Sequence, residues 1–131
     1  MPRPRSFRPR RAAAPGAKET PIHRAILHAV RLALPHAAIN HSPNEIANEI
    51  ARRKAVELGM RAGWPDIEIV EAGRFYAIEV KTARGVQSAE QRACQAAIEA
   101  AGGRYGVARS VNDALALLDA WGLTTRARVG A

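Results

Sequence analysis

The chain has 131 residues, of which 47% are hydrophobic, with one cysteine and a formal net charge of +8. A single cysteine excludes an internal disulfide, and no apolar run approaches the ~20 residues that a membrane-spanning helix needs. We therefore expect a cytoplasmic protein with one domain and a modest core.

The first 18 residues are unusually basic. They hold six of the 20 lysines and arginines, no acid, and prolines at positions 2, 4, 9 and 15. Proline and charge at this density predict a disordered tail over residues 1–18, and basic arms bind phosphate groups without sequence preference. A tail that only aids solubility fits the same composition. We expect the folded domain to span residues 19–124 and a flexible tail to follow at residues 125–131.

Two helices are expected before residue 60. Thr20 and Pro21 form an N-cap and first-turn pair, and apolar residues at helical spacing follow as far as Pro35. A short strand is expected over residues 37–41. The segment Ser42-Pro43-Asn44-Glu45 is a capping box that opens a second helix, which ends near Gly59.

The middle of the chain predicts a β-hairpin. Residues 66–70 and 75–81 alternate in polarity with period two, and Ala72-Gly73 stands between them. A two-residue turn there places Asp66 opposite Glu79, with Lys81 on the same face, whereas a three-residue turn shifts this register by one. The opposite face becomes the core, so one face is apolar and the other carries the polar cluster; the core residues are Ile67, Ile69, Tyr76, Ile78 and Val80.

The rest of the chain predicts a helix, a strand and a helix. A second capping box at Ser88 and Gln91 starts a helix that runs to Ala101, and residues 105–108 form a strand that the crossover makes parallel to the preceding one. Ser110 caps the last helix. The order of elements indicates an α/β fold.

Several of these residues together resemble a nuclease family. Gly63-Trp64-Pro65-Asp66, a hairpin, and then Glu79-Val80-Lys81 resembles the PD-(D/E)xK superfamily, and the following Gly85, Ser88 and Gln91 look like its VRR-NUC branch. The resemblance implies a restriction-endonuclease-like core, αβββαβα-like, with a central mixed β-sheet flanked by helices. It also implies DNA as the partner, in a bacterial or phage-infected cell.

The chemistry of the cluster agrees with that resemblance. Carboxylates are the ligands that Mg²⁺ prefers, and a bound cation can stabilise charge on a scissile phosphate and activate water. We expect Asp66 and Glu79 to hold Mg²⁺, or Mn²⁺ in its place. The family adds the carbonyl of Val80 as a ligand and uses the lysine, here Lys81, to orient the attacking water. The alternative is a surface salt bridge between Lys81 and the two acids.

A third acid of the site is left open between two residues. Glu19 matches an acid at the start of the family's first helix, yet an acid there also suits the helix dipole. Glu45 is the rival, and it is also a capping residue. Gln91 has a similar double interpretation, as a DNA or water contact and as the capping-box glutamine.

Other candidate residues are weighed against ordinary structural roles. Phosphate contacts are assigned to basic residues that flank the site, with an ordinary solvated face as the alternative. These residues are Arg52, Arg53, Lys54, Arg61 and Arg84. Trp64 either stacks on a base or packs in the core. The four histidines lack the spacing of a zinc site, and Cys94 is expected to be a buried thiol.

The function predicted from these observations is a metal-dependent DNA endonuclease. The resemblance implies branched DNA, including Holliday junctions, and symmetric cleavage of a junction would need a homodimer. The apolar helix from Leu115 to Trp121 is a candidate dimer interface. Flap, repair and restriction nucleases remain alternatives, as does a module that binds DNA without cleaving it.

Overall fold

The computed structural model describes residues 21–42 and 49–123, which form four helices and one four-stranded sheet. Their order is α1 (Pro21–Ala33), β1 (Ala38–His41), α2 (Glu49–Glu57), β2 (Ile67–Glu71), β3 (Arg74–Val80), α3 (Ala89–Ala100), β4 (Arg104–Ala108) and α4 (Val111–Ala120). The predicted α/β class is confirmed. Predictions for residues 1–18, Glu19, Glu45 and residues 125–131 fall outside the described residues.

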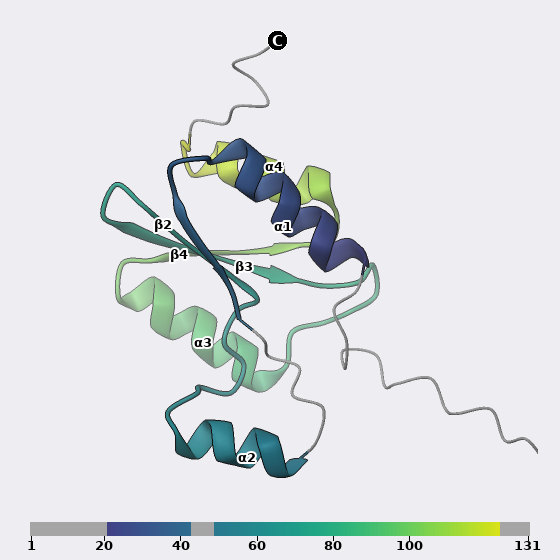
Figure 1. The fold of residues 1–131 in the computed structure, drawn as a ribbon, viewed down its shortest axis with the longest axis vertical. Coiled ribbons are helices and arrows are strands. Elements are labelled where there is room, and N and C mark those ends of the chain that lie inside the picture. Colours follow the sequence, from purple (N-terminus) through teal and green to yellow (C-terminus); the bar gives the residue numbers. More distant parts are fainter. Residues whose placement is uncertain (1–20, 43–48, 124–131) are drawn as a thin grey trace, which may run out of the picture.

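The sheet has the strand order β1-β2-β3-β4 (Figure 1). β2 runs antiparallel to both β1 and β3, and β4 runs parallel to β3. The parallel pair is joined through α3, because a parallel return requires a crossover connection. This confirms the predicted mixed sheet.

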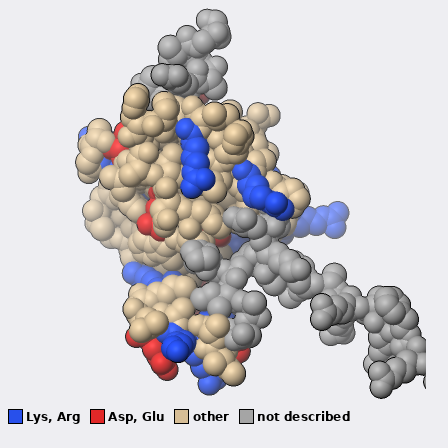
Figure 2. Space-filling model, viewed as in Figure 1, with Lys and Arg blue, Asp and Glu red and all other residues tan. Residues whose placement is uncertain are grey.

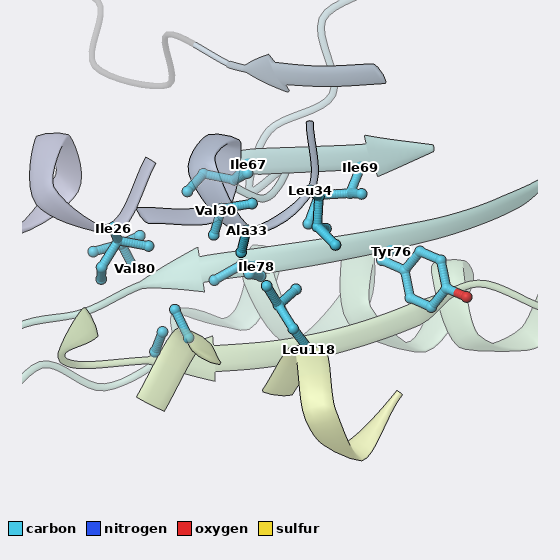
Figure 3. Packing of buried hydrophobic residues seen from close by; sticks show 12 residues of the cluster. Ile26, Val30, Ala33, Leu34, Ile67, Ile69, Tyr76, Ile78, Val80 and Leu118 are labelled. Carbon is cyan, nitrogen blue, oxygen red and sulfur yellow. The ribbon is translucent and has the colours of Figure 1, made fainter. Parts of the chain in front are cut away.

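One face of the sheet is covered by α1 and α4, which lie side by side (Figure 1). The buried residues of α1 follow its predicted stripe at helical spacing, and they pack onto isoleucines from the two hairpin strands (Figure 3). At one edge the Tyr76 ring lies 5.3 Å from that of Trp121, measured between centroids. This cluster contains Ile26, Val30, Ala33, Leu34, Ile67, Ile69, Tyr76, Ile78, Val80, Ala108, Ala114 and Leu118.

The apolar side of α4 packs inside its own chain. Ala114 and Leu118 are fully buried, and Leu115, Leu117 and Trp121 are partly buried against the same cluster. The apolar pattern of this helix, interpreted from the sequence as a possible dimer interface, is therefore accounted for by the core of one chain.

The other face of the sheet is covered by α3 over part of its area. A second apolar cluster contains Ala77, Ile98 and Tyr105, with Trp64, Phe75 and Val107 packed against it. The prediction of one apolar face and one polar face was therefore wrong at the turn end of the hairpin. It holds at the opposite end, where Asp66 and Glu79 lie. Trp64 packs against Phe75, with ring centroids 6.1 Å apart, as the packing interpretation expected.

Helix α2 is set apart from these layers (Figure 1). None of its residues is buried, and Ile50 and the adjoining Leu58 are each 81% exposed. Charged side chains of both signs appear together over this part of the surface (Figure 2). Within residues 21–42 and 49–123, none of the helices has the length and apolar character needed to cross a membrane.

Candidate active site

The hairpin turn fixes the register of the site. Ala72 and Gly73 both have positive φ, at 50° and 76°, which is the conformation of a two-residue type I′ turn. The resulting pairs include Ile67 with Ile78 and Glu71 with Arg74. Continuing this register by one residue aligns Asp66 with Glu79, as the sequence predicted.

Asp66 is held in place from three directions. Its Oδ2 accepts a hydrogen bond of 2.8 Å from the Val80 N–H, and its Oδ1 lies 3.4 Å from Nε2 of His23. Its backbone carbonyl accepts from the Ser42 N–H at 2.8 Å. The carboxyl group is therefore positioned between β3 and α1, while the Asp66 backbone is fixed to the residue after β1, and the residue is only 6% exposed.

Glu79 is more deeply buried, at 2% exposure. Its Oε1 accepts from Nε2 of Gln91 at 3.0 Å and lies 3.9 Å from Nζ of Lys81. Its Oε2 is also buried but has no hydrogen-bond partner. A buried carboxylate oxygen without a donor is unfavourable unless it carries a proton or binds a cation.

The pKa values of the two acids shift in opposite directions. Burial raises the pKa of Glu79 to about 9, and the neighbouring Asp66 carboxylate adds to the rise while Lys81 opposes it. Burial acts in the same direction on Asp66, but the contacts with His23, Glu79 and the Val80 N–H outweigh it and lower its pKa below the usual value. Adjacent carboxylates commonly separate in this way, because two negative charges at close range disfavour each other.

Gln91 connects the carboxylates to the lysine. Its Oε1 accepts from Nζ of Lys81 at 2.7 Å and from the Ser88 N–H at 2.8 Å, while its Nε2 donates to Glu79. Since both contacts of Oε1 are N–H donors, the orientation of the amide is defined. The predicted capping box is confirmed, with the Gln91 N–H donating to Ser88 Oγ. The same side chain thus caps α3 and orients two residues of the site.

Gly63 explains how the Gly-Trp-Pro-Asp segment reaches this helix. Its φ is +79°, and a Cβ at this position would lie 2.4 Å from the backbone carbon of Glu90 and 2.6 Å from the Gln91 nitrogen. Only glycine permits so close an approach of two backbones. The contact fixes the segment that leads to Asp66, three residues later, against the first turn of α3.

His23 is the residue of this site that the sequence interpretation missed. The spacing of the four histidines only argued against a zinc site, yet His23 is 8% exposed and lies 3.4 Å from Asp66. Its ring also packs edge-on against that of His41, with centroids 5.9 Å apart. Its position three residues before Ile26, on the buried stripe of α1, was the available signal.

The remaining predicted residues lie away from these contacts. Lys54, Arg61 and Arg84 are exposed, on α2, before Gly63 and in the loop after Lys81, respectively. Cys94 is buried, as expected, and burial raises the pKa of its thiol, which lies near Arg61. Glu68 shares the face of Asp66, but its Oε1 accepts from Ser42 Oγ at 2.5 Å and from Asn40 Nδ2 at 3.3 Å.

No protein-family model matches the sequence, and neither does any curated protein. A solved structure described as a VRR_NUC domain protein does match, with a TM-score of 0.52 and 23% sequence identity. The chain has the fold of that VRR_NUC domain protein. The similarity covers 62% of this chain and 64% of the other, so this chain spans less than two thirds of the length of the protein it matches.

Proposed function

We propose that this protein is a metal-dependent endonuclease that hydrolyses phosphodiester bonds in DNA. The observation that carries the proposal is the Oε2 atom of Glu79, which is buried, without a hydrogen-bond partner, in the same cluster as Asp66. Together with the VRR_NUC fold, two adjacent buried carboxyl groups, one of them with a strongly raised pKa, support a cation site in which the metal would replace the Glu79 proton. Nζ of Lys81 lies 3.9 Å from the other oxygen, Oε1, and does not hydrogen-bond to Oε2.

The donor set suits a hard divalent cation. Asp66 and Glu79 would supply carboxylate oxygens, and Val80, whose N–H already fixes Asp66, would supply its carbonyl oxygen. Within residues 21–42 and 49–123, no group of three or more His, Cys, Asp or Glu side chains is arranged to hold a metal ion. Mg²⁺, or Mn²⁺ in its place, would stabilise charge on the scissile phosphate and lower the pKa of an attacking water.

Lys81 and Gln91 have the remaining proposed roles in the site. The Lys81 side chain is 17% exposed, so part of it is accessible from solvent while Gln91 holds Nζ near Glu79. In this position the ammonium can orient a water molecule and offset the negative charge of a phosphate. Gln91 keeps Lys81 and Glu79 in a fixed relation, so its proposed role is to position these groups as well as to contact DNA.

The third acid remains a choice between Glu19 and Glu45. Glu19 precedes α1 by two residues, and His23 in the first turn of that helix contacts Asp66. Glu45 follows Ser42 by three residues, and the Ser42 N–H donates to the Asp66 carbonyl. Both sequence positions are therefore close to anchored residues of the site. We retain Glu19 as the proposed catalytic acid, and comparing Glu19→Gln with Glu45→Gln in cleavage assays decides between them.

We further propose branched DNA as the substrate and a homodimer as the active form. Cutting two opposed strands of a four-way junction requires two sites related by a dyad. Lys54, Arg61 and Arg84 are the proposed phosphate contacts. Sedimentation of the full chain, alone and with a four-way junction, tests the dimer, and a monomer at cleavage-competent concentrations would contradict it.

The deciding experiment measures cleavage of labelled duplex, flap and four-way junction DNA by the full chain with Mg²⁺, Mn²⁺ or EDTA. Asp66→Asn and Glu79→Gln should each reduce the cleavage rate by about 100-fold or more. This is the usual effect of removing a group that stabilises charge in the transition state. DNA binding should stay near the wild-type level. Glu90→Gln, an exposed acid at the start of α3, serves as the matched control. Binding without cleavage under all metal conditions would instead identify a silent DNA-binding module.

A further inference from the structure

The loop that follows Lys81 lacks an apolar anchor. It connects the end of β3 at Val80 to the N-cap of α3 at Ser88, and its large apolar residue, Val86, is 79% exposed. A segment without buried apolar side chains opens easily unless polar contacts hold it. The position of this loop therefore depends on its hydrogen bonds.

Arg109 supplies two of those hydrogen bonds. Its Nη1 donates to the carbonyl oxygens of Thr82 and Gly85, at 2.6 Å each. The Gly85 N–H also donates to the Thr82 carbonyl at 3.1 Å, which closes a turn between these residues. The guanidinium thus binds both ends of one turn, and a charged donor makes these bonds stronger than neutral ones.

Arg109 is itself fixed at a rigid junction. The Ala108 carbonyl, at the end of β4, accepts from the Lys81 N–H at 3.0 Å. The Arg109 N–H donates to Oδ2 of Asp113 at 2.9 Å, and the Asp113 N–H donates to Oγ of Ser110, the N-cap of α4. The guanidinium therefore extends from a strand end and a helix start that are both held in place.

The turn lies beside the lysine of the proposed site. A Cβ placed on Gly85 would lie 3.4 Å from Cδ of Lys81, within van der Waals distance. The Gly85 backbone therefore lies close to the Lys81 stem, and displacing it would open space beside that stem. The far end of the same side chain makes the contacts with Gln91 and Glu79.

We propose that Arg109 is a positioning residue that holds Lys81 in place through the turn from Thr82 to Gly85. This inference rests on the proposed nuclease function, in which Lys81 acts on the reacting groups. The competing role for an exposed arginine near such a site is a direct contact with a DNA phosphate. The two roles predict different kinetic effects, because a phosphate contact changes binding and its salt dependence, whereas misplacing Lys81 changes the rate of the bound complex.

The first test uses Arg109→Ala and Arg109→Lys in the full chain, with Arg104→Ala as the control. Arg104 is an exposed arginine at the other end of β4, so its removal changes the net charge equally. Single-turnover cleavage at saturating protein with Mg²⁺ should slow by about 10- to 100-fold in Arg109→Ala, the effect of a small misplacement. The lysine variant should recover part of the rate, and the control should match the wild type. DNA binding with Ca²⁺ in place of Mg²⁺ should be unchanged in all three. The proposal would be overturned if Arg109→Ala bound DNA with lower affinity but cleaved at the wild-type rate at saturating protein. The slope of log affinity against log salt concentration would then fall by about one.

A second test does not depend on cleavage. Hydrogen exchange of the backbone amides of residues 81–88 in the free protein should accelerate in Arg109→Ala but not in Arg104→Ala. The Gly85 and Lys81 amides are the reporters, since both are hydrogen-bonded in this arrangement. Unchanged exchange would overturn the role of Arg109. If the wild type cleaves no DNA but amide exchange accelerates in Arg109→Ala, the proposed nuclease function is wrong. The stabilisation of the loop by Arg109 would still be supported.

Discussion

His23 and Asp66 lie in contact although they come from different elements, with Nε2 of the imidazole 3.4 Å from Oδ1 of the carboxylate. The contact joins the first turn of α1 to the residue that precedes β2. It is one of the interactions that lower the pKa of Asp66 and keep it ionised.

We predict that His23→Ala destabilises the protein by about 1 to 3 kcal/mol, the usual effect of leaving a buried polar group without its partner. Urea denaturation measures this. His28→Ala is the control, because His28 lies on the same helix and is exposed. His23→Ala should also weaken metal binding, measured by calorimetry, because the pKa of Asp66 rises when the imidazole is removed. Equal stability and equal metal affinity in both variants would show that the contact is incidental.

Metal binding should release a proton near neutral pH. The pKa of Glu79 is raised from 4.5 to about 9, so this carboxyl is protonated at pH 7, and a cation must displace the proton to bind. Calorimetry with Mn²⁺ in buffers of different ionisation enthalpy should give about one proton released per ion. The Glu79→Gln variant should release none. A buffer-independent enthalpy in the wild type would contradict the raised pKa.

The same group makes stability depend on pH in the absence of metal. The native state binds the Glu79 proton more tightly than the unfolded chain does, so its contribution to stability is fully present below pH 4.5 and declines up to about pH 9. Thermal unfolding in EDTA should therefore show the wild type losing stability relative to Glu79→Gln as the pH rises between these values. A constant difference between the two proteins would exclude this linkage.

Gln91 should matter more for activity than for folding. Gln91→Ala removes the side-chain contacts with Lys81, Glu79 and Ser88, each worth about 0.5 to 1.5 kcal/mol in stability. Gln95→Ala is the matched control, since Gln95 lies one turn along α3 and contacts Gln87 and Glu99. We expect both variants to lose stability, but only Gln91→Ala to slow cleavage. Equal rates in the two variants would remove Gln91 from the site.

Gly63→Ala should be more disruptive than Gly102→Ala. Both glycines have positive φ, at 79° and 93°, so each alanine incurs about 1 to 2 kcal/mol of backbone strain. Only at Gly63 would the new Cβ collide with the backbone of α3, whereas Gly102 has open space. Denaturant titrations should show the larger loss for Gly63→Ala, together with slower cleavage. Equal losses would mean that the segment can move away from α3 freely.

Local signals in the sequence were enough to predict the hairpin and the caps. Ala72 and Gly73 define the turn, and the turn defines which residues pair; Ser88 and Gln91 define the start of α3 through contacts only three residues apart. These features depend on neighbours along the chain. The VRR_NUC resemblance then identified a fold that a solved structure also has.

Features that depend on distant contacts could not be predicted in the same way. Phe75 and Ala77 alternate with apolar residues on the other face, and only the arrival of Ile98 from α3 shows that their own face is also covered. The role of His23 follows from the approach of α1 to Asp66, which no spacing in the sequence encodes. The exposure of Ile50 on α2 is likewise a tertiary property.

The isolation of α2 makes this helix a site at which a protease can cut the chain. A nine-residue helix without buried side chains has little protection beyond its own hydrogen bonds, so it opens at a small fraction of the global free energy. Among the residues that the structure describes, a protease should cut there first. The cut would separate α1 and β1 from the rest of the domain, yet the packing of Val30 and Leu34 against the hairpin would hold the pieces together. The nicked protein should behave as a complemented pair of fragments, with His23 on one and Asp66 on the other.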